Sequence, residues 1–169
     1  MKSIKLCAAP LLILFLALSL SNVQAQDNEE SDIILGGGLS YGEKMSDLGI
    51  QLGGYYIYDE TFRFGGDFIY WLRDSHSNVS YTNLEINANV HYLFYEENDI
   101  TLYGIGTLGI HYMSFDYDFA ESVSDTELGL GIGAGIEYDI GAVLLYGEPR
   151  LFLTGFDQFA LNFGVRFGI

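Results

Sequence analysis

The sequence has almost no cysteine and little proline. Its single cysteine, Cys7, cannot form an intramolecular disulfide, so disulfide bonds are not expected to stabilise the fold. Only two prolines occur, Pro10 and Pro149, whereas there are 21 glycines, many of them inside apolar stretches. Because glycine destabilises helix interiors, this composition favours β-strands.

Basic residues are scarce as well. The chain has 7 lysines and arginines against 23 aspartates and glutamates, so no binding of nucleic acid is expected. Such acidity often accompanies disorder, but 49% of the residues are hydrophobic, with 13 Tyr and 12 Phe. A chain of this composition has enough apolar surface to fold.

The N-terminal segment has the pattern of an export signal. Lys2 and Lys5 precede an apolar run from Leu11 to Leu20, and the small residues up to Ala25 offer a cleavage site. Cleavage would also remove Cys7. The expected parts of the chain are a signal peptide, a short acidic tail and a single domain, at residues 1–25, 26–31 and 32–169.

After this segment, no apolar run reaches the roughly 18 to 20 residues that a membrane-spanning helix needs. Instead, apolar residues alternate with small or polar residues over eight segments, which predicts strands with one apolar face. The segments are Ile33–Gly42, Leu48–Tyr58, Phe62–Arg73, Leu84–Phe94, Ile100–Phe115, Glu127–Tyr138, Val143–Leu153 and Leu161–Ile169.

The fifth segment is ambiguous because both of its faces carry apolar residues. One face holds Leu102, Leu108, Ile110 and Tyr112. The other holds Tyr103, Ile105, Thr107 and His111. We expect the first face to point outward.

Alternation alone does not say which face is outside, since soluble lipocalin-like barrels keep their apolar face inward. Residue size favours the opposite arrangement, because the narrow interior of an eight-stranded barrel suits small residues such as the glycines of Glu127–Tyr138. The apolar face of each segment spans roughly 9 to 11 residues, enough to cross a bilayer when tilted. Short and longer connections alternate, as in transmembrane barrels.

Aromatic residues gather at the strand ends, which is typical of the interfacial girdles of membrane barrels. Toward one rim we expect Tyr56, Tyr58, Phe62, Tyr92, Phe94, Tyr138 and Phe167, and toward the other Tyr41, Tyr70, Tyr81 and Tyr112.

The last segment is the most specific. Ala160–Ile169, with Phe163, Val165, Phe167 and Ile169 on one face, resembles the C-terminal signal that the outer-membrane insertion machinery recognises, although the family usually ends on Phe or Trp. On these residues the chain resembles the small eight-stranded outer-membrane barrels of the OmpA and OmpX type, including porin-family and opacity-like domains.

The resemblance implies an all-β fold, an eight-stranded antiparallel up-and-down transmembrane barrel in a bacterial outer membrane. It also implies partners: membrane lipid and lipopolysaccharide around the barrel, and the barrel-insertion machinery during assembly. We expect a monomer without cofactor or metal.

Nine charged residues have the inward phase: Arg63, Asp67, Arg73, Glu85, Glu127, Glu137, Glu148, Arg150 and Arg166. Their charges nearly cancel, and the planar guanidinium of arginine can bridge two carboxylates in a narrow lumen. We therefore expect a charge network that closes the lumen. The alternative is a narrow porin-like channel for small solutes or ions, in which rearranged pairs open a file of water.

A lipid-modifying enzyme is the third hypothesis. Lipid A deacylases carry a His and a Ser two residues apart on one face, but Leu93 follows His91 at that spacing and Met113 follows His111. The remaining histidine, His76, lies in a predicted loop. The sequence therefore predicts a barrel without a catalytic site, with a structural or interaction role in the cell envelope.

Overall fold

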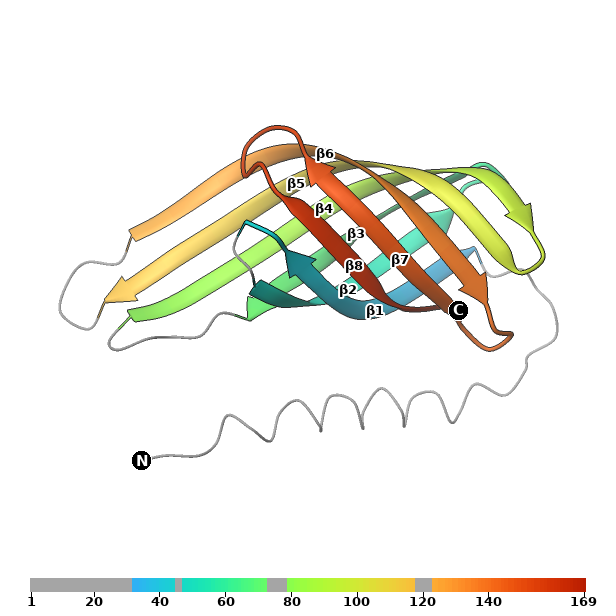
Figure 1. Ribbon diagram of the computed structural model, residues 1–169, viewed down its shortest axis with the longest axis horizontal. Helices are drawn as coiled ribbons and strands as arrows, with labels where there is room; N and C mark the ends of the chain where they lie inside the picture. Colours follow the sequence, from blue (N-terminus) through green and yellow to red (C-terminus); the bar gives the residue numbers. More distant parts are fainter. Residues whose placement is uncertain (1–31, 45–46, 73–78, 118–122) are drawn as a thin grey trace, which may run out of the picture. The chain divides into compact units, whose positions relative to one another are not determined.

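The computed structural model describes residues 32–44, 47–72, 79–117 and 123–169; the predicted signal peptide and acidic tail lie outside these ranges. The described residues form eight antiparallel strands that close into a barrel (Figure 1). The strands are β1 (Ile33–Gly42), β2 (Asp47–Ile57), β3 (Phe62–Leu72), β4 (Val79–Glu97), β5 (Ile100–Tyr117), β6 (Val123–Asp139), β7 (Leu144–Phe152) and β8 (Phe159–Gly168). Strands adjacent in the chain pair with one another, and β1 pairs with β8. The predicted fold class is confirmed.

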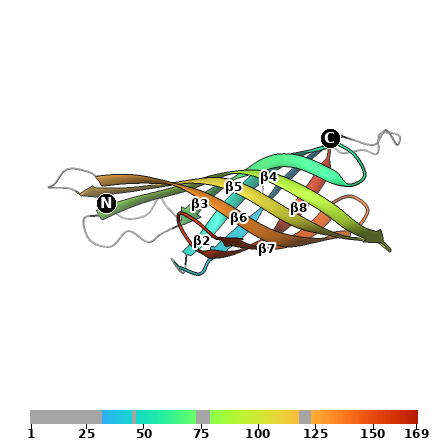
Figure 2. The same ribbon diagram turned by 90° about the horizontal axis from the view of Figure 1, so that it is seen from above.

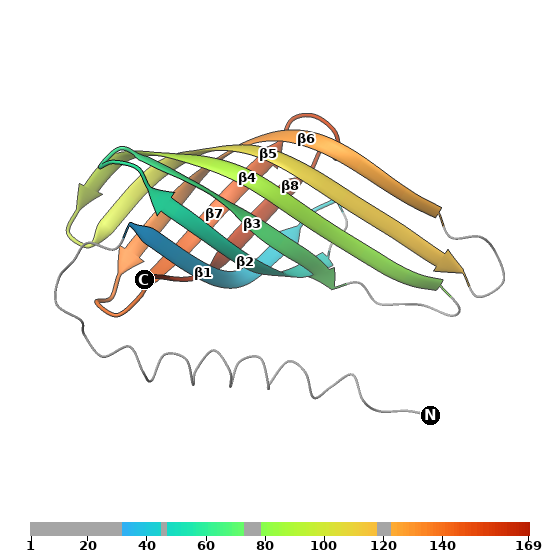
Figure 3. The ribbon, with the colours of Figure 1, turned by 180° about the vertical axis from the view of Figure 1, so that it is seen from behind.

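The outward face of the barrel is apolar, as predicted. Leu52, Ile132 and Phe94 are 54%, 55% and 58% exposed. The fifth strand has the predicted phase, because Leu108 is 46% exposed whereas Tyr103 is fully buried. The front and back views show how the strands wrap around one lumen (Figures 1 and 3). None of the described segments is a helix long and apolar enough to cross a membrane.

Glycines on the inner face leave room for large aromatic side chains. A Cβ atom at Gly135 would lie 2.2 Å from the Tyr103 ring, and one at Gly65 would lie 2.7 Å from a ring atom of Tyr55. Both distances are far shorter than van der Waals contact. The small inner-face residues thus reflect the packing of particular rings as well as the curvature of the wall.

Three neighbouring strands are longer than the rest. β4, β5 and β6 have 19, 18 and 17 residues, whereas the other strands have 9 to 11. They continue past the others at the end with the longer loops, here called the loop end (Figure 2). The opposite end, with the connections 58–61, 98–99 and 140–143, is called the turn end. The fifth strand, expected to end near Phe115, extends to Tyr117.

Tyr81 does not belong to the outward aromatic girdle, and that prediction was wrong. Tyr81 pairs across the sheet with Phe115, and their ring centroids lie 5.4 Å apart. Alternation along β4 from the buried Asn83 places Tyr81 on the lumen-side face. The residue lies in the extended part of β4, where the polarity of the two faces differs from that of the barrel wall.

Candidate functional site

Charged side chains form one continuous chain of ion pairs across the lumen, here called the ion-pair chain. In order, its six members are Arg63, Glu137, Arg166, Glu148, Arg150 and Asp67. The successive N–O distances are 2.6, 2.5, 2.5, 2.7 and 2.8 Å. Its first and last members lie on β3, and the others on β6, β8 and β7. The ion-pair chain therefore joins opposite walls of the barrel, and its charges cancel.

Glu148 lies at the centre of the ion-pair chain and is fully buried. One of its carboxylate oxygens accepts a hydrogen bond from Arg166, and the other accepts one from Arg150. The Tyr103 hydroxyl donates to the first oxygen at 2.7 Å. A carboxylate is tolerated in a protein interior only with partners of this kind, so Glu148 depends on both arginines.

Three tyrosine rings enclose the guanidinium of Arg166. Its Cζ atom lies 4.1 Å from the ring centroid of Tyr146, 4.6 Å from that of Tyr55 and 5.9 Å from that of Tyr103. Attraction between a cation and the face of an aromatic ring adds to the ion pairs of this residue. Arg166 is thus held by both charge and packing.

Neutral side chains extend the network at its Asp67 end. Asn87 donates to one oxygen of Asp67 at 2.8 Å, and Asn89 donates to the other at 2.6 Å. The Thr107 hydroxyl donates in turn to Asn89 at 2.8 Å. The carboxylate of Asp67 therefore has amide partners on β4 in addition to Arg150.

Aromatic side chains form a second layer between the ion-pair chain and the loop end. Trp71, Phe152 and Phe156 are all nearly inaccessible to solvent. Phe156 comes from the connection between β7 and β8 and packs on Phe152 and His111, with ring centroids 4.2 and 4.6 Å apart. This connection folds over the lumen, which the sequence pattern did not predict.

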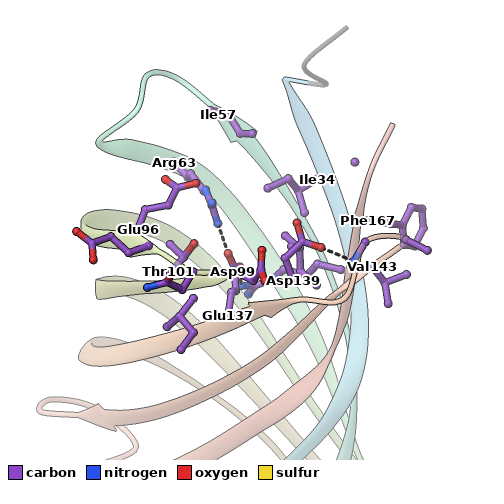
Figure 4. A pocket seen from close by; sticks show the side chains of 18 residues that line it. Ile34, Ile57, Arg63, Glu96, Asp99, Thr101, Glu137, Asp139, Val143 and Phe167 are labelled. Carbon is purple, nitrogen blue, oxygen red and sulfur yellow. Dashed lines mark hydrogen bonds and ion pairs between the residues drawn. The ribbon is translucent and has the colours of Figure 1, made fainter. Parts of the chain in front are cut away.

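A cavity of about 540 Å³ at the turn end reaches the ion-pair chain. Arg63, Glu137 and Arg166 are among its lining residues, and Figure 4 shows Arg63 and Glu137 joined inside the barrel. Several acids also line this cavity: Glu96, Glu97, Asp99 and Asp139. Over the described ranges, no group of three or more His, Cys, Asp or Glu side chains is arranged to hold a metal ion.

The nine charged residues predicted to face the lumen have different surroundings, and six of them form the ion-pair chain. Glu85 is buried, but it accepts hydrogen bonds from the neutral groups of Trp71 and Asn87. Glu127 is half-buried in the loop-end part of β6. Arg73 lies outside the described residues.

The four residues of the predicted assembly signal lie at the end of the chain. Phe163, Val165 and Phe167 have the outward phase of β8, and Ile169, 62% exposed, follows the last residue of that strand. Their part in assembly stays a prediction.

Sequence reasoning missed Tyr55, and it considered His91 only as a catalytic histidine. His91 is fully buried, and its ring lies 4.6 Å from that of Tyr55 and 4.7 Å from that of Tyr103. For the tyrosine a signal was present, because the three tyrosines that surround Arg166 are each paired with a glycine on the next strand. These pairs are Tyr55 with Gly65, Tyr103 with Gly135 and Tyr146 with Gly164.

Comparison with solved structures shows the same fold in several bacterial proteins. Neisserial surface protein A has 17% sequence identity and a TM-score of 0.59, over 81% of this chain and 94% of that protein. The attachment invasion locus protein Ail of Yersinia pestis has 19% identity and a TM-score of 0.57, over 81% and 97%. The N-terminal β-barrel domain of Pseudomonas aeruginosa OprF has 11% identity and a TM-score of 0.63, over 81% and 96%.

Sequence comparison identifies the family. No curated protein sequence matches this chain. The model of the outer membrane protein beta-barrel domain matches residues 13–167, which includes all the strands except the last residue of β8. The barrel, its apolar outer wall and this match agree, and the chain belongs to the outer membrane protein β-barrel domain family, which implies a place in the bacterial outer membrane.

Proposed function

We propose that the protein is exported by its signal peptide and acts as a monomeric outer-membrane barrel with a closed lumen, in a structural or interaction role. The observation that carries the proposal is the ion-pair chain, which runs from Arg63 to Asp67 without a break. Lipid and lipopolysaccharide surround the apolar wall, and the insertion machinery binds the last strand during assembly. The proposal includes no catalytic role and no cofactor.

The energetics of buried charge support a closed lumen. Removing one partner of a buried ion pair costs about 3 to 5 kcal/mol, because the other charge is left without compensation. Moving Glu148 aside would take one of two ion-pair partners from Arg150 and one of two from Arg166, and would leave the buried network with an excess positive charge. A path wide enough for a hydrated ion would also have to pass the aromatic layer of Trp71 and Phe152. These costs favour the closed barrel over a channel.

A narrow gated channel is the second candidate, and one feature favours it. The cavity at the turn end already reaches Arg63. Among the described residues, Arg63 has one ion-pair partner, whereas Arg150 and Arg166 have two each. Arg63 is therefore the least constrained arginine of the ion-pair chain, and opening would begin there.

Swelling of proteoliposomes distinguishes the two candidates. Vesicles carrying the folded protein are diluted into isotonic solutions of small sugars or amino acids, and light scattering is recorded. The closed barrel predicts the rate of protein-free vesicles. Faster swelling that depends on solute size would support the channel and reject the closed lumen.

For the interaction role, we propose a partner of opposite charge to the ligand seen with one similar structure. Ail has been crystallised in complex with sucrose octasulfate, a heparin analogue and a polyanion. In this chain, the described residues near the loop end include the acids Glu43, Asp125, Glu127 and Asp157, with Lys44 beside them. Like charges repel, so we propose a partner that is cationic rather than anionic.

A further inference from the structure

The extended parts of β4, β5 and β6 form a three-stranded sheet at the loop end. Pairing of β3 with β4 stops at Tyr70 and Leu84, and pairing of β6 with β7 stops at Gly131 and Phe152. Beyond these points, and apart from the Leu153 N–H that donates to the Leu130 carbonyl, β4, β5 and β6 pair only with one another over the described ranges. The barrel wall therefore becomes an open sheet with two edges.

The polarity of this sheet inverts along the strands. On the outward face, the strand register aligns an apolar row across the three strands: Ile86, Ile110 and Leu128. Two rows closer to the loop end, it aligns a row of hydroxyl side chains: Thr82, Ser114 and Ser124. On the lumen side, the register aligns a polar row: Glu85, His111 and Glu127. Two rows closer to the loop end, it aligns an apolar row: Tyr81, Phe115 and Val123. An outward hydroxyl row does not suit lipid, so this part of the sheet lies beyond the hydrocarbon region.

The inverted apolar row ends at an exposed residue. The rings of Tyr81 and Phe115 pack edge to face with centroids 5.4 Å apart, and Phe115 pairs in turn with Val123. Val123 lies on β6, one of the two edge strands of this sheet, and is 58% exposed. One more strand beside β6 would continue the row and cover Val123.

The backbone of β6 is open along the same edge. The Leu130 N–H donates to Thr154, and its carbonyl accepts from Leu153, so both groups point away from β5. Alternation gives the peptide groups of Thr126 and Ser124 the same direction. Within the described residues no backbone group pairs with them, although the Thr126 N–H donates to the Asp125 carboxylate at 2.9 Å. Unpaired edges of this kind accept an added strand.

The negative charges along this edge of β6 favour a positively charged partner. Asp125 and Glu127 are two residues apart on the lumen-side face, next to Val123. A second copy of the chain, paired edge to edge, would bring four carboxylates together and is disfavoured. A strand with basic residues would instead form cross-strand ion pairs.

We propose that the edge of β6 from Val123 to Glu127 binds an extended, cationic segment of another polypeptide as an added strand. In the added segment, every second residue faces the lumen side: an apolar side chain lies opposite Val123, and Lys or Arg lies opposite Asp125 and Glu127. The residues between them are small or carry a hydroxyl group. On binding, a carbonyl of the added strand replaces the Asp125 carboxylate at the Thr126 N–H. The inference rests on the proposed interaction role and names the partner class for it.

The test uses the full-length protein in lipid nanodiscs and a fluorescent peptide, Val-Thr-Lys-Thr-Lys-Thr-Val, which fits the edge in either direction. We expect saturable binding by anisotropy, absent from empty nanodiscs, and chemical-shift changes at the amides of Ser124 and Thr126. A peptide with the same composition but the lysines moved to the other face should bind at least about tenfold more weakly. Equal binding of the two peptides would reduce the effect to general attraction by an acidic surface and overturn the proposal.

Three variants localise the binding. Thr126→Pro removes the open N–H without removing a bond to β5, and the pair Asp125→Lys with Glu127→Lys reverses the charge; both should lose the peptide. The matched control, Glu96→Lys with Glu97→Lys, makes the same charge change at the turn end and should keep it. Folding of each variant is checked by its heat-modifiable mobility on gels.

The remaining outcomes are also decisive. Binding that survives Thr126→Pro, or fails in the wild-type protein, would overturn the added-strand proposal. Neither result would affect the closed lumen, which vesicle swelling tests separately. Crosslinking of Ser124→Cys into a dimer that excludes the peptide would assign the edge to a second copy instead.

Discussion

Arg166 donates to Glu148 across 2.5 Å, from the strand that closes the barrel to the strand before it. Because β8 also pairs with β1, this contact lies beside the seam where the first and last strands meet. The ion-pair chain is therefore complete only when the barrel is closed. We expect its members to stabilise the closed barrel as well as to fill the lumen.

Replacing Glu148 with Gln should destabilise the barrel strongly. The change leaves Arg150 and Arg166 without their shared carboxylate, and the expected loss is about 3 to 5 kcal/mol of unfolding free energy. Urea unfolding in lipid vesicles measures it. The control, Glu85→Gln, removes a buried carboxylate whose donors, Trp71 and Asn87, are neutral, with an expected loss of about 1 to 3 kcal/mol. Equal losses would show that charge pairing contributes little.

Replacing Gly135 with Ala should impair folding. Its new Cβ atom would meet the Tyr103 ring at 2.2 Å, and overpacking of this kind typically costs about 1 to 3 kcal/mol. The matched control is Gly104→Ala on β5, where a Cβ atom would meet nothing within 4 Å. The fraction of heat-modifiable protein after refolding reports the result. Similar yields for the two variants would contradict the inner-face packing described for Tyr103.

Most of the fold could be predicted from the sequence because the physical signal repeats in every strand. Lipid outside and a crowded lumen inside impose a period of two, as in Leu128, Leu130 and Ile132 against Gly129 and Gly131. The ambiguous fifth strand was also predicted in the right phase. The phase of this strand depends on the space beside it on β6, because Gly135, the partner of Tyr103, leaves room for the Tyr103 ring inside the barrel.

The site was less predictable, because periodicity gives the face of a residue but not its partner. The inward phase of Arg166 and Glu148 could be read from the sequence, whereas their pairing depends on the register of β7 with β8. Phe156 lies in a connection, where no period applies, and its place in the lumen follows from contacts with Phe152 and His111. Tyr81 was assigned to the wrong face because the rule for the membrane-spanning wall does not hold beyond it.

Arginine substitutions at two heights on the outward face of β6 should show which part of the strand lies in the membrane. Ile132→Arg puts a guanidinium on the apolar wall and should cost about 2 to 4 kcal/mol if the residue lies near the bilayer midplane. Ser124→Arg makes the same addition on the same face of β6, in the hydroxyl row, and should be nearly neutral. Folding yield into vesicles and unfolding free energy test both variants. A large loss for Ser124→Arg would place the extended sheet inside the bilayer.

Export should shorten the chain at its N-terminus. Cleavage after Ala25 predicts a mature protein that begins at Gln26. Intact mass and N-terminal sequencing of the protein from isolated outer membranes measure this directly. A mature form that retains Cys7 would contradict the predicted signal peptide.

Single-channel recording tests the closed lumen most directly. Folded wild-type protein, verified by its gel mobility, is added to a planar bilayer, and the current is recorded over a range of voltages. Because the ion-pair chain and the aromatic layer both cross the lumen, we predict no current above that of the bare bilayer. Reproducible steps of one size, altered by Arg63→Ser, would show that ions pass through the lumen and would contradict the account.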